Sequence, residues 1–315
     1  MIEVLLSLWV VCALLIIYEQ KVIRIIIYFC IFSLITSVCY FVLGAPDVAL
    51  AEGSIGAFII VFFITCFEKY YGLVPDLQNK PPAVKKRLAT VKQYIAPLVF
   101  TVFLFGLFLF FIPAGTASTY LKNQYVSLFM RDIGGENAVT AIYLGYRVYD
   151  TLLEALMLLV AVIAVFHVSW RDEHYVPERK ESPLNRSNKA VFIIRNISPL
   201  LLLFGIYLVV NGYRSPGGGF QGGVLIASFF ICRYKIYGLY DINVDRLINI
   251  EKLSFIILTL LAVFVVFFGF TAYFRTANVS LMQSVYLISM NALIGLKVAC
   301  GFVVLFYRYV AVERK

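Results

Sequence analysis

Charged residues are scarce in this chain. Only 14% of its 315 residues are charged and 62% are hydrophobic, whereas soluble domains carry about 25% charged and about 45–50% apolar residues. This shortage excludes an ordinary water-soluble domain. The net charge of +9 does not indicate nucleic-acid binding, because Lys and Arg fall in short clusters between apolar runs. The composition and these runs predict an all-α integral membrane protein.

Residues that usually hold metals or carry out redox chemistry are also few. The six cysteines lie within apolar runs without a Cys-x-x-Cys pair, and are expected to be small apolar side chains. The two histidines, His167 and His174, lie at or beyond the end of one run, whereas haem ligands would lie within facing helices. No set typical of a hydrolase is visible. We expect no cofactor, no metal site and no active site in this chain.

Nine apolar runs are long enough to cross about 30 Å of hydrocarbon as helices. They are Val4–Tyr18, Val22–Leu43, Val48–Phe67, Ile95–Ile112, Tyr149–Val168, Ile197–Asn211, Gly223–Tyr240, Leu253–Ala272 and Val285–Tyr307. The first run lacks the basic start and cleavage site of a signal peptide, so we expect it to be a span. An outside N-terminus places 21 Lys and Arg residues inside and five outside. The positive-inside rule therefore predicts an outside N-terminus and a cytoplasmic C-terminus.

Two polar, proline-containing segments divide the runs into three modules. The predicted organisation is a three-helix module at 1–71, a basic cytoplasmic linker at 72–94, a two-helix module at 95–169, a polar cytoplasmic linker at 170–190 and a four-helix module at 191–315. The polar segment Thr116–Ala138 is expected to be an outer loop or a short surface helix of unassigned role.

Ionisable side chains within the apolar runs are the first candidates for function, because burying a charge in a bilayer costs several kcal/mol. Asp47 follows Pro46 and fits the first turn of a helix. Glu52 lies five residues, about 7.5 Å, further in, where capping no longer explains it. We interpret Glu52 as a protonatable group of an ion path. The alternative is a fixed hydrogen bond or ion pair between helices.

Three more ionisable groups lie in later runs. Asp150 and Glu154 stand four residues apart on one helix face, where two carboxylates can hold and pass a proton. Alternatively Arg147 pairs with Asp150, which leaves Glu154 as the candidate. Lys297 lies near the middle of the last run, too deep to reach water easily. It is either a switchable charge or the fixed partner of a carboxylate on another subunit.

The segment Asn211–Gly223 is rich in glycine but lacks the Gly-Lys-Ser/Thr of a phosphate-binding loop. Its motif consists of Pro216, Gly217, Gly218, Gly219, Gly222 and Gly223. The spacings Gly218/Gly222 and Gly219/Gly223 are typical of closely packed helices. We therefore expect a tight outer connection and helix packing rather than ion coordination.

Three motifs resemble known domains. The stretch Leu43–Gly53, Leu-Gly-Ala-Pro-Asp-Val-Ala-Leu-Ala-Glu-Gly, resembles the MbhD-like domain that also ends the large MrpA subunit. Tyr146–Glu154, Tyr-Arg-Val-Tyr-Asp-Thr-Leu-Leu-Glu, resembles the MbhE-like domain, except that Leu153 stands at a glycine position. Ser198–Gly223, ending in Pro-Gly-Gly-Gly-Phe-Gln-Gly-Gly, is similar to the MrpB (MnhB) domain, although Tyr213 stands where that pattern often has histidine.

This resemblance to Mrp-type multisubunit Na+/H+ antiporters implies a non-catalytic subunit in the cell membrane. Its implied partners are antiporter-like membrane subunits, the lipid bilayer, and Na+ or H+. The carried-over acidic positions are Glu52, Asp150 and Glu154. The same domains occur in membrane-bound hydrogenases and related respiratory complexes, so membership of such a redox-driven complex is a second possibility. A purely structural linker subunit is a third, and a membrane enzyme with its own active site is the last.

Overall fold

A computed structural model describes residues 2–71, 99, 101–103, 105–106, 119–168, 188–237, 242–268 and 279–311. All regular elements in these residues are helical, which confirms the predicted class. They are α1 (Ile2–Tyr18), α2 (Val22–Val42), α3 (Pro46–Tyr71), α5 (Thr119–Asp132), α6 (Ala138–Ala141), the π-helix η2 (Ile142–Tyr146), α7 (Val148–Val168), α8 (Asn188–Asn211), α9 (Gly219–Tyr237), α10 (Val244–Phe268) and α12 (Val279–Ala311).

Six of these helices, α2, α3, α7, α8, α10 and α12, are long and apolar enough to cross a membrane. The chain is therefore a multi-pass membrane protein. Helix α1, with 17 residues, is shorter than these six, and the glycine-rich α9 is not among them. The predicted span Ile95–Ile112 lies largely outside the described residues, as do both predicted linkers. The count of nine spans stays a prediction.

Four helices begin four or more residues earlier than the apolar runs predict. The predicted starts at Ile197, Gly223, Leu253 and Val285 are wrong, because α8, α9, α10 and α12 begin at Asn188, Gly219, Val244 and Val279. In α10 the extra turns are polar, and Asn243 Oδ1 caps them by accepting the N–H of Arg246 at 3.1 Å. Hydropathy alone does not register such polar first turns.

Helix α8 continues through Pro199, which lacks the N–H that would pair with the carbonyl of Arg195. The hydroxyl of Ser198 lies 3.5 Å from that carbonyl and supplies a replacement donor. This contact explains why the proline does not end the helix.

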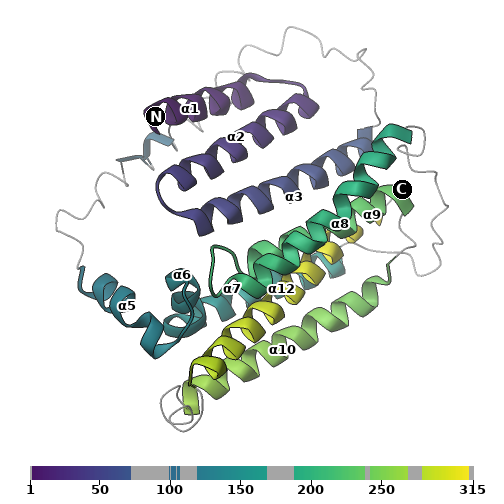
Figure 1. Ribbon diagram of the computed structural model, residues 1–315. Helices are drawn as coiled ribbons and strands as arrows, with labels where there is room; N and C mark the ends of the chain where they lie inside the picture. The colour runs from purple at the N-terminus through teal and green to yellow at the C-terminus, as the bar shows by residue number, and fades with distance from the viewer. Residues whose placement is uncertain are drawn as a thin grey trace. The chain divides into compact units, whose positions relative to one another are not determined.

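The chain forms two compact units, residues 1–70 with 128–315, and residues 71–127. In the larger unit, α12 packs against α7, α8, α9 and α10 (Figure 1). In its membrane-length window 67% of the residues are buried, against 17–33% in the other five spans. Its buried side chains recur every three or four residues, as at Leu287, Met290, Ile294 and Val298. Helix α12 is therefore the central helix of this unit.

Glycines allow α8, α9 and α12 to approach closely. A Cβ atom at Gly223 of α9 would lie 2.7 Å from the carbonyl oxygen of Gly295 on α12. A Cβ at Gly222 would lie 2.6 Å from the carbonyl oxygen of Gly205 on α8. Larger side chains at these positions would force the backbones apart.

Helices α1, α2 and α3 run side by side in alternating directions (Figure 1). Trp9 of α1 donates its indole N–H to Thr36 of α2 at 2.8 Å. Helix α3 contacts α12 through aromatic rings, because the centroids of Phe58 and Phe302 are 4.8 Å apart at nearly a right angle. These contacts attach the first three helices to the central helix.

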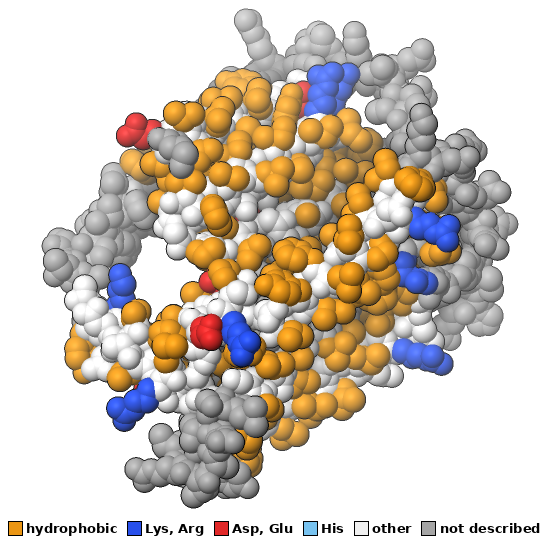
Figure 2. Space-filling model, in the orientation of Figure 1, with side chains coloured by type: hydrophobic (Ala, Val, Ile, Leu, Met, Phe, Trp, Pro, Cys, Tyr) orange, Lys and Arg blue, Asp and Glu red, His pale blue; other side chains and the backbone are white. Residues whose placement is uncertain are grey.

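Hydrophobic side chains cover most of the face shown in Figure 2, and Lys and Arg side chains lie mainly toward its edges. Leu203 of α8 and Leu260 of α10 are each 64% exposed. Exposing apolar surface to water costs about 25 cal/mol per Å², and lipid tails remove this cost. The surface is suited to a bilayer or to other membrane subunits.

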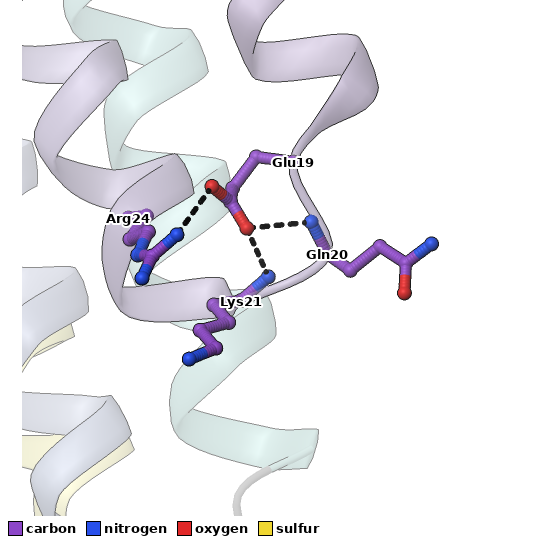
Figure 3. Close-up of polar contacts among 4 residues, drawn as sticks. All are labelled: Glu19, Gln20, Lys21 and Arg24. Atoms are coloured by element: carbon purple, nitrogen blue, oxygen red, sulfur yellow. Dashed lines mark hydrogen bonds and ion pairs between the residues drawn. The ribbon is translucent and has the colours of Figure 1, made fainter. Parts of the chain in front are cut away.

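The turn between α1 and α2 carries an anion at a helix start. Figure 3 shows the Glu19 carboxylate accepting the backbone N–H groups of Gln20, at 2.9 Å, and Lys21, at 3.0 Å, and pairing with Arg24 at 3.4 Å. The Lys21 N–H is the main cause that lowers the pKa of Glu19 below its ordinary value of 4.5. The ionised carboxylate therefore holds the start of α2.

Glu19→Gln should loosen the first turn of α2 at neutral pH, because the N–H groups lose a charged acceptor. Because the pKa of Glu19 is lower in the folded protein, the stabilisation by its carboxylate is fully present above pH 4.5. This stabilisation is lost as the pH falls through the folded-state pKa. Hydrogen exchange of residues 20–24 should rise in the variant at neutral pH, and should match the unaltered protein at acidic pH. Equal protection at neutral pH would contradict this role.

Candidate functional site

A polar junction forms where α3, the segment before α6, and the loop between α8 and α9 meet. Its centre is Asn137, which is 8% exposed. Its Nδ2 donates to Asp47 Oδ1 at 3.1 Å and to the carbonyl oxygens of Gly212 at 3.2 Å and Ser215 at 3.0 Å. Its Oδ1 caps α6 by accepting the N–H of Val139 at 2.9 Å. One amide therefore joins three distant parts of the chain.

Asp47 lies in the first turn of α3, as predicted, but its side chain points into this junction. Its Oδ1 also accepts the backbone N–H of Gly217 at 3.0 Å, and the residue is 8% exposed. Gly135, with φ +85°, permits the close approach on the other side, because a Cβ there would lie 2.9 Å from the carbonyl oxygen of Tyr213. The glycine-rich loop is thereby fixed to α3 and to the start of α6.

A second set of polar contacts leads from the junction to α12. The Tyr143 hydroxyl donates to Asn291 Oδ1 at 2.8 Å, and the same oxygen accepts the N–H of Gly219 at 3.1 Å. Tyr143 belongs to the π-helix η2, a geometry frequent at functional sites. Thr151 Oγ1 donates to the Tyr143 carbonyl at 2.6 Å. The side chain of Asn291, which belongs to α12, is thus held against the first residue of α9, inside the helix bundle.

Glu52 faces α2 rather than this junction. Its Oε1 accepts the hydroxyl of Ser33 at 2.9 Å. Gly56, one turn further along α3, makes room for that hydroxyl, because a Cβ there would lie 2.0 Å from Ser33 Oγ. The structure therefore contains the interhelical hydrogen bond that was the predicted alternative. The partner of the Glu52 carboxyl is the neutral hydroxyl of Ser33.

Asp150 and Glu154 lie on α7 and have different surroundings. Asp150 forms an ion pair with Arg147, three residues earlier, and both side chains are about half exposed. Glu154 is exposed on the surface of the helix. The predicted alternative for Asp150, an ion pair with Arg147, is present. Glu154 is accessible from lipid or from a partner subunit.

Lys297 of α12 is fully buried and pairs with Glu251 of α10, with Nζ 2.5 Å from Oε1. The expectation that a carboxylate partner would come from another subunit is wrong, because Glu251 belongs to the same chain. Sequence reasoning assigned Glu251 to a polar inner segment, since the apolar run starts at Leu253. The helix-capping pattern at Asn243 would have placed it in the helix.

The predicted candidates do not all meet. Among the described contacts, Asp47 joins Gly217 of the glycine-rich motif, whereas Glu52, Glu154 and Lys297 each have separate surroundings. Sequence reasoning missed Asn137 and Asn291 because asparagine is common in loops and helix ends. Only the folded chain shows that both are buried at contacts between modules.

Two family models match the chain. One describes a domain related to the MnhB subunit of Na+/H+ antiporter and covers residues 190–304. The other describes MbhD, one of the subunits of MBH, and covers residues 7–70. These matches confirm the resemblance of the first and last modules.

Among curated proteins, a probable K+/H+ antiporter protein of Rhizobium meliloti, described as the A/B subunit, is 24% identical over 243 residues, covering 65% of this chain and 23% of that protein. This chain spans 50%, 23% and 52% of the lengths of three curated relatives that it matches.

Two solved structures have a similar fold. A chain of the Mrp complex from Dietzia sp. DQ12-45-1b gives a TM-score of 0.75 at 18% identity, covering 99% of this chain and 35% of that one. A chain of the membrane-bound sulfane sulfur reductase, an archaeal respiratory membrane complex, gives a TM-score of 0.57 at 24% identity. That match covers 72% of this chain and 100% of the other. At these identities the likeness shows the fold alone.

Proposed function

Since the chain carries an MbhD domain and an MnhB-related domain, we propose that it is a membrane subunit of a multisubunit cation/proton antiporter, in which it contributes to ion or proton translocation. The observation that carries this proposal is the presence of both domains in one chain. Similarity to the probable K+/H+ antiporter protein of Rhizobium meliloti supports it. The expected partners are further antiporter-like subunits in the cell membrane, with no cofactor on this chain.

The proposal includes nine spans, an outside N-terminus and a middle MbhE-like module at 95–169. The polar junction supports this topology, because Asp47, Asn137 and Gly217 come from three segments that the prediction places outside. Adding or removing one span between them would put them on opposite sides of the membrane. Their mutual contacts favour an even number of spans between these segments, as predicted.

In this proposal Glu52, Glu154 and Lys297 are stations on a hydrated path, and Asp150 and Asp47 tune or support it. Glu52 is paired with a hydroxyl, so it can gain or lose a proton without breaking an ion pair. Glu154 is exposed on α7, and a carboxyl facing lipid is costly unless a partner subunit covers it. The continuation of the path is therefore expected on a neighbouring subunit.

The reconstituted complex provides the test. Glu52→Gln and Glu154→Gln should each lower cation/proton exchange by at least about tenfold, equivalent to about 1.4 kcal/mol in the barrier. Glu19→Gln, which changes a carboxylate in the turn between α1 and α2, serves as the control. Full exchange by both path variants in a normally assembled complex would contradict the proposal.

A respiratory complex is the second candidate, favoured by the shared fold with a chain of the sulfane sulfur reductase complex. Co-purifying subunits with iron–sulfur or nickel–iron centres would identify that setting. A structural linker is the third, favoured by the polar junction. It predicts that removing Glu52, Glu154 and Lys297 together impairs assembly or changes nothing, and leaves transport by an assembled complex intact.

A further inference from the structure

The buried pair of Glu251 and Lys297 has an apolar environment. The two side chains are 0% and 1% exposed. Leu258 of α10, and Ile294 and Val298 of α12, belong to the buried hydrophobic core of the same two helices. Lys297 Nζ also lies 5.5 Å from the centroid of the Phe255 ring. Cys300, three residues further along α12, is the other titratable side chain that interacts with the pair.

The pair is incompletely satisfied. Glu251 Oε2 is buried and has no hydrogen-bond partner among the described residues. A carboxylate has about four lone-pair sites to fill. Buried charges are stabilised only when these remaining sites are also used. A pair that served packing alone would leave no such acceptor open.

A second open polar atom lies on α12, the helix that carries Lys297. Asn291 Nδ2 is buried and unpartnered among the described residues, while Asn291 Oδ1 accepts from Tyr143 and Gly219. Asn291 precedes Lys297 by six residues, about 9 Å along α12. One open donor and one open acceptor are therefore buried among the described residues. Such atoms are typical partners of internal water or of a transported ion.

Burial keeps both charges away from water. Lys297 lies 18 residues from the start of α12 and 14 from its end, about 27 Å and about 21 Å. In so low a dielectric, a change in charge at one group must be compensated at the other. A cation added to Glu251 would therefore favour loss of a proton from Lys297.

We propose that Glu251 and Lys297 form a one-for-one exchange site, where an alkali-metal cation on the Glu251 carboxylate and the proton on the Lys297 amine exclude each other. The cation binds the carboxylate, including its open Oε2, and one proton leaves Nζ, so the ammonium becomes a neutral amine. Total charge is unchanged. In the reverse step a proton returns to the amine and the cation departs. This inference rests on the proposed transport function and assigns a chemical basis to it.

Arginine at position 297 separates exchange from structure. Arg keeps a positive charge for Glu251 but does not release its proton in proteins. Lys297→Arg should therefore assemble and yet lower antiport by at least about tenfold. If the bulk of arginine prevents assembly, the double variant Glu251→Gln/Lys297→Met is tested instead. It removes both charges together and should lower antiport in the same way. The exposed neighbour Lys252→Arg is the matched control and should keep full antiport.

Proton release on cation binding gives a second readout. The purified complex in weak buffer is mixed with NaCl, KCl or choline chloride, and released protons are followed with a pH indicator. The unaltered complex should release more protons than the double variant with NaCl or KCl, and the effective salt identifies the cation. Equal proton release by the unaltered complex and the double variant would overturn the exchange site. Equal antiport by the unaltered complex, Lys297→Arg and the double variant would overturn it as well. Absence of antiport in the unaltered complex would instead refute the proposed function.

Discussion

Replacing Lys297 with methionine is expected to destabilise the protein by about 3–5 kcal/mol, the cost of leaving a buried charge without its partner. Glu251 would retain a carboxylate with no counter-charge in an apolar core. Methionine has a similar length and fills the space, so lost packing contributes little. Titration of the purified protein with SDS in mixed micelles, followed by fluorescence, measures the free energy of unfolding.

The matched double variant separates the charge effect from the packing effect. Glu251→Gln/Lys297→Met removes both charges, and replacement of a whole buried pair is often neutral or stabilising. Its free energy of unfolding should therefore lie closer to that of the unaltered protein than either single variant does. Lys252→Met, one residue from Glu251 but exposed, should change stability by less than about 0.5 kcal/mol. Additive losses from the two single changes would show that the pair is not coupled.

This pair also marks what the sequence can and cannot predict. Lys297 is recognisable because it lies near the middle of a long apolar run. Glu251 lies two residues before its run begins, beside Lys252, and looks like part of a polar loop. Only the start of α10 at Val244 brings it into the helix. Hydropathy detects membrane segments, and it misses a charge near a segment end whose partner is on another helix.

The helices themselves follow closely from composition. The predicted Val22–Leu43 and Tyr149–Val168 agree with α2 and α7 to within one residue at each end. Helix α2 lies between two short connections, residues 19–21 and 43–45. The starts of α8 and α10 were each predicted nine residues too late, because their first turns are polar. A hydropathy threshold chosen for the bilayer therefore finds the apolar middle of a helix more reliably than its ends.

The polar junction was not predictable, although each of its residues is visible in the sequence. Asn137 contacts Asp47, 90 residues away, and Ser215, 78 residues away. No local pattern indicates which loops meet at the end of a bundle. The sequence leaves Thr116–Ala138 as an outer loop or a short surface helix. In the structure, the turn at Gly134 and Gly135 brings the start of α6 against the Tyr213 carbonyl.

Asn137→Ala is expected to destabilise the protein by about 3 kcal/mol. A hydrogen bond to a charged group contributes about 1.5–3 kcal/mol, and Asn137 donates one to Asp47. Loss of the cap of α6 adds about 1 kcal/mol. Asp47 and Gly212 each keep one other donor, Gly217 N–H and Thr140 Oγ1 respectively, so the loss is limited. Unfolding by SDS titration of the purified protein measures it.

Asn137→Ser divides this loss into its two causes. Serine still caps a helix but is too short to reach Asp47 and the loop carbonyls together. It should therefore recover only about 1 kcal/mol of the loss seen with alanine. Asn196→Ala, which removes an exposed amide bonded only to the Phe192 carbonyl within α8, is the control and should change little. If serine restored full stability, the cap alone would matter, and the junction would not be what holds the first module of the chain to the last.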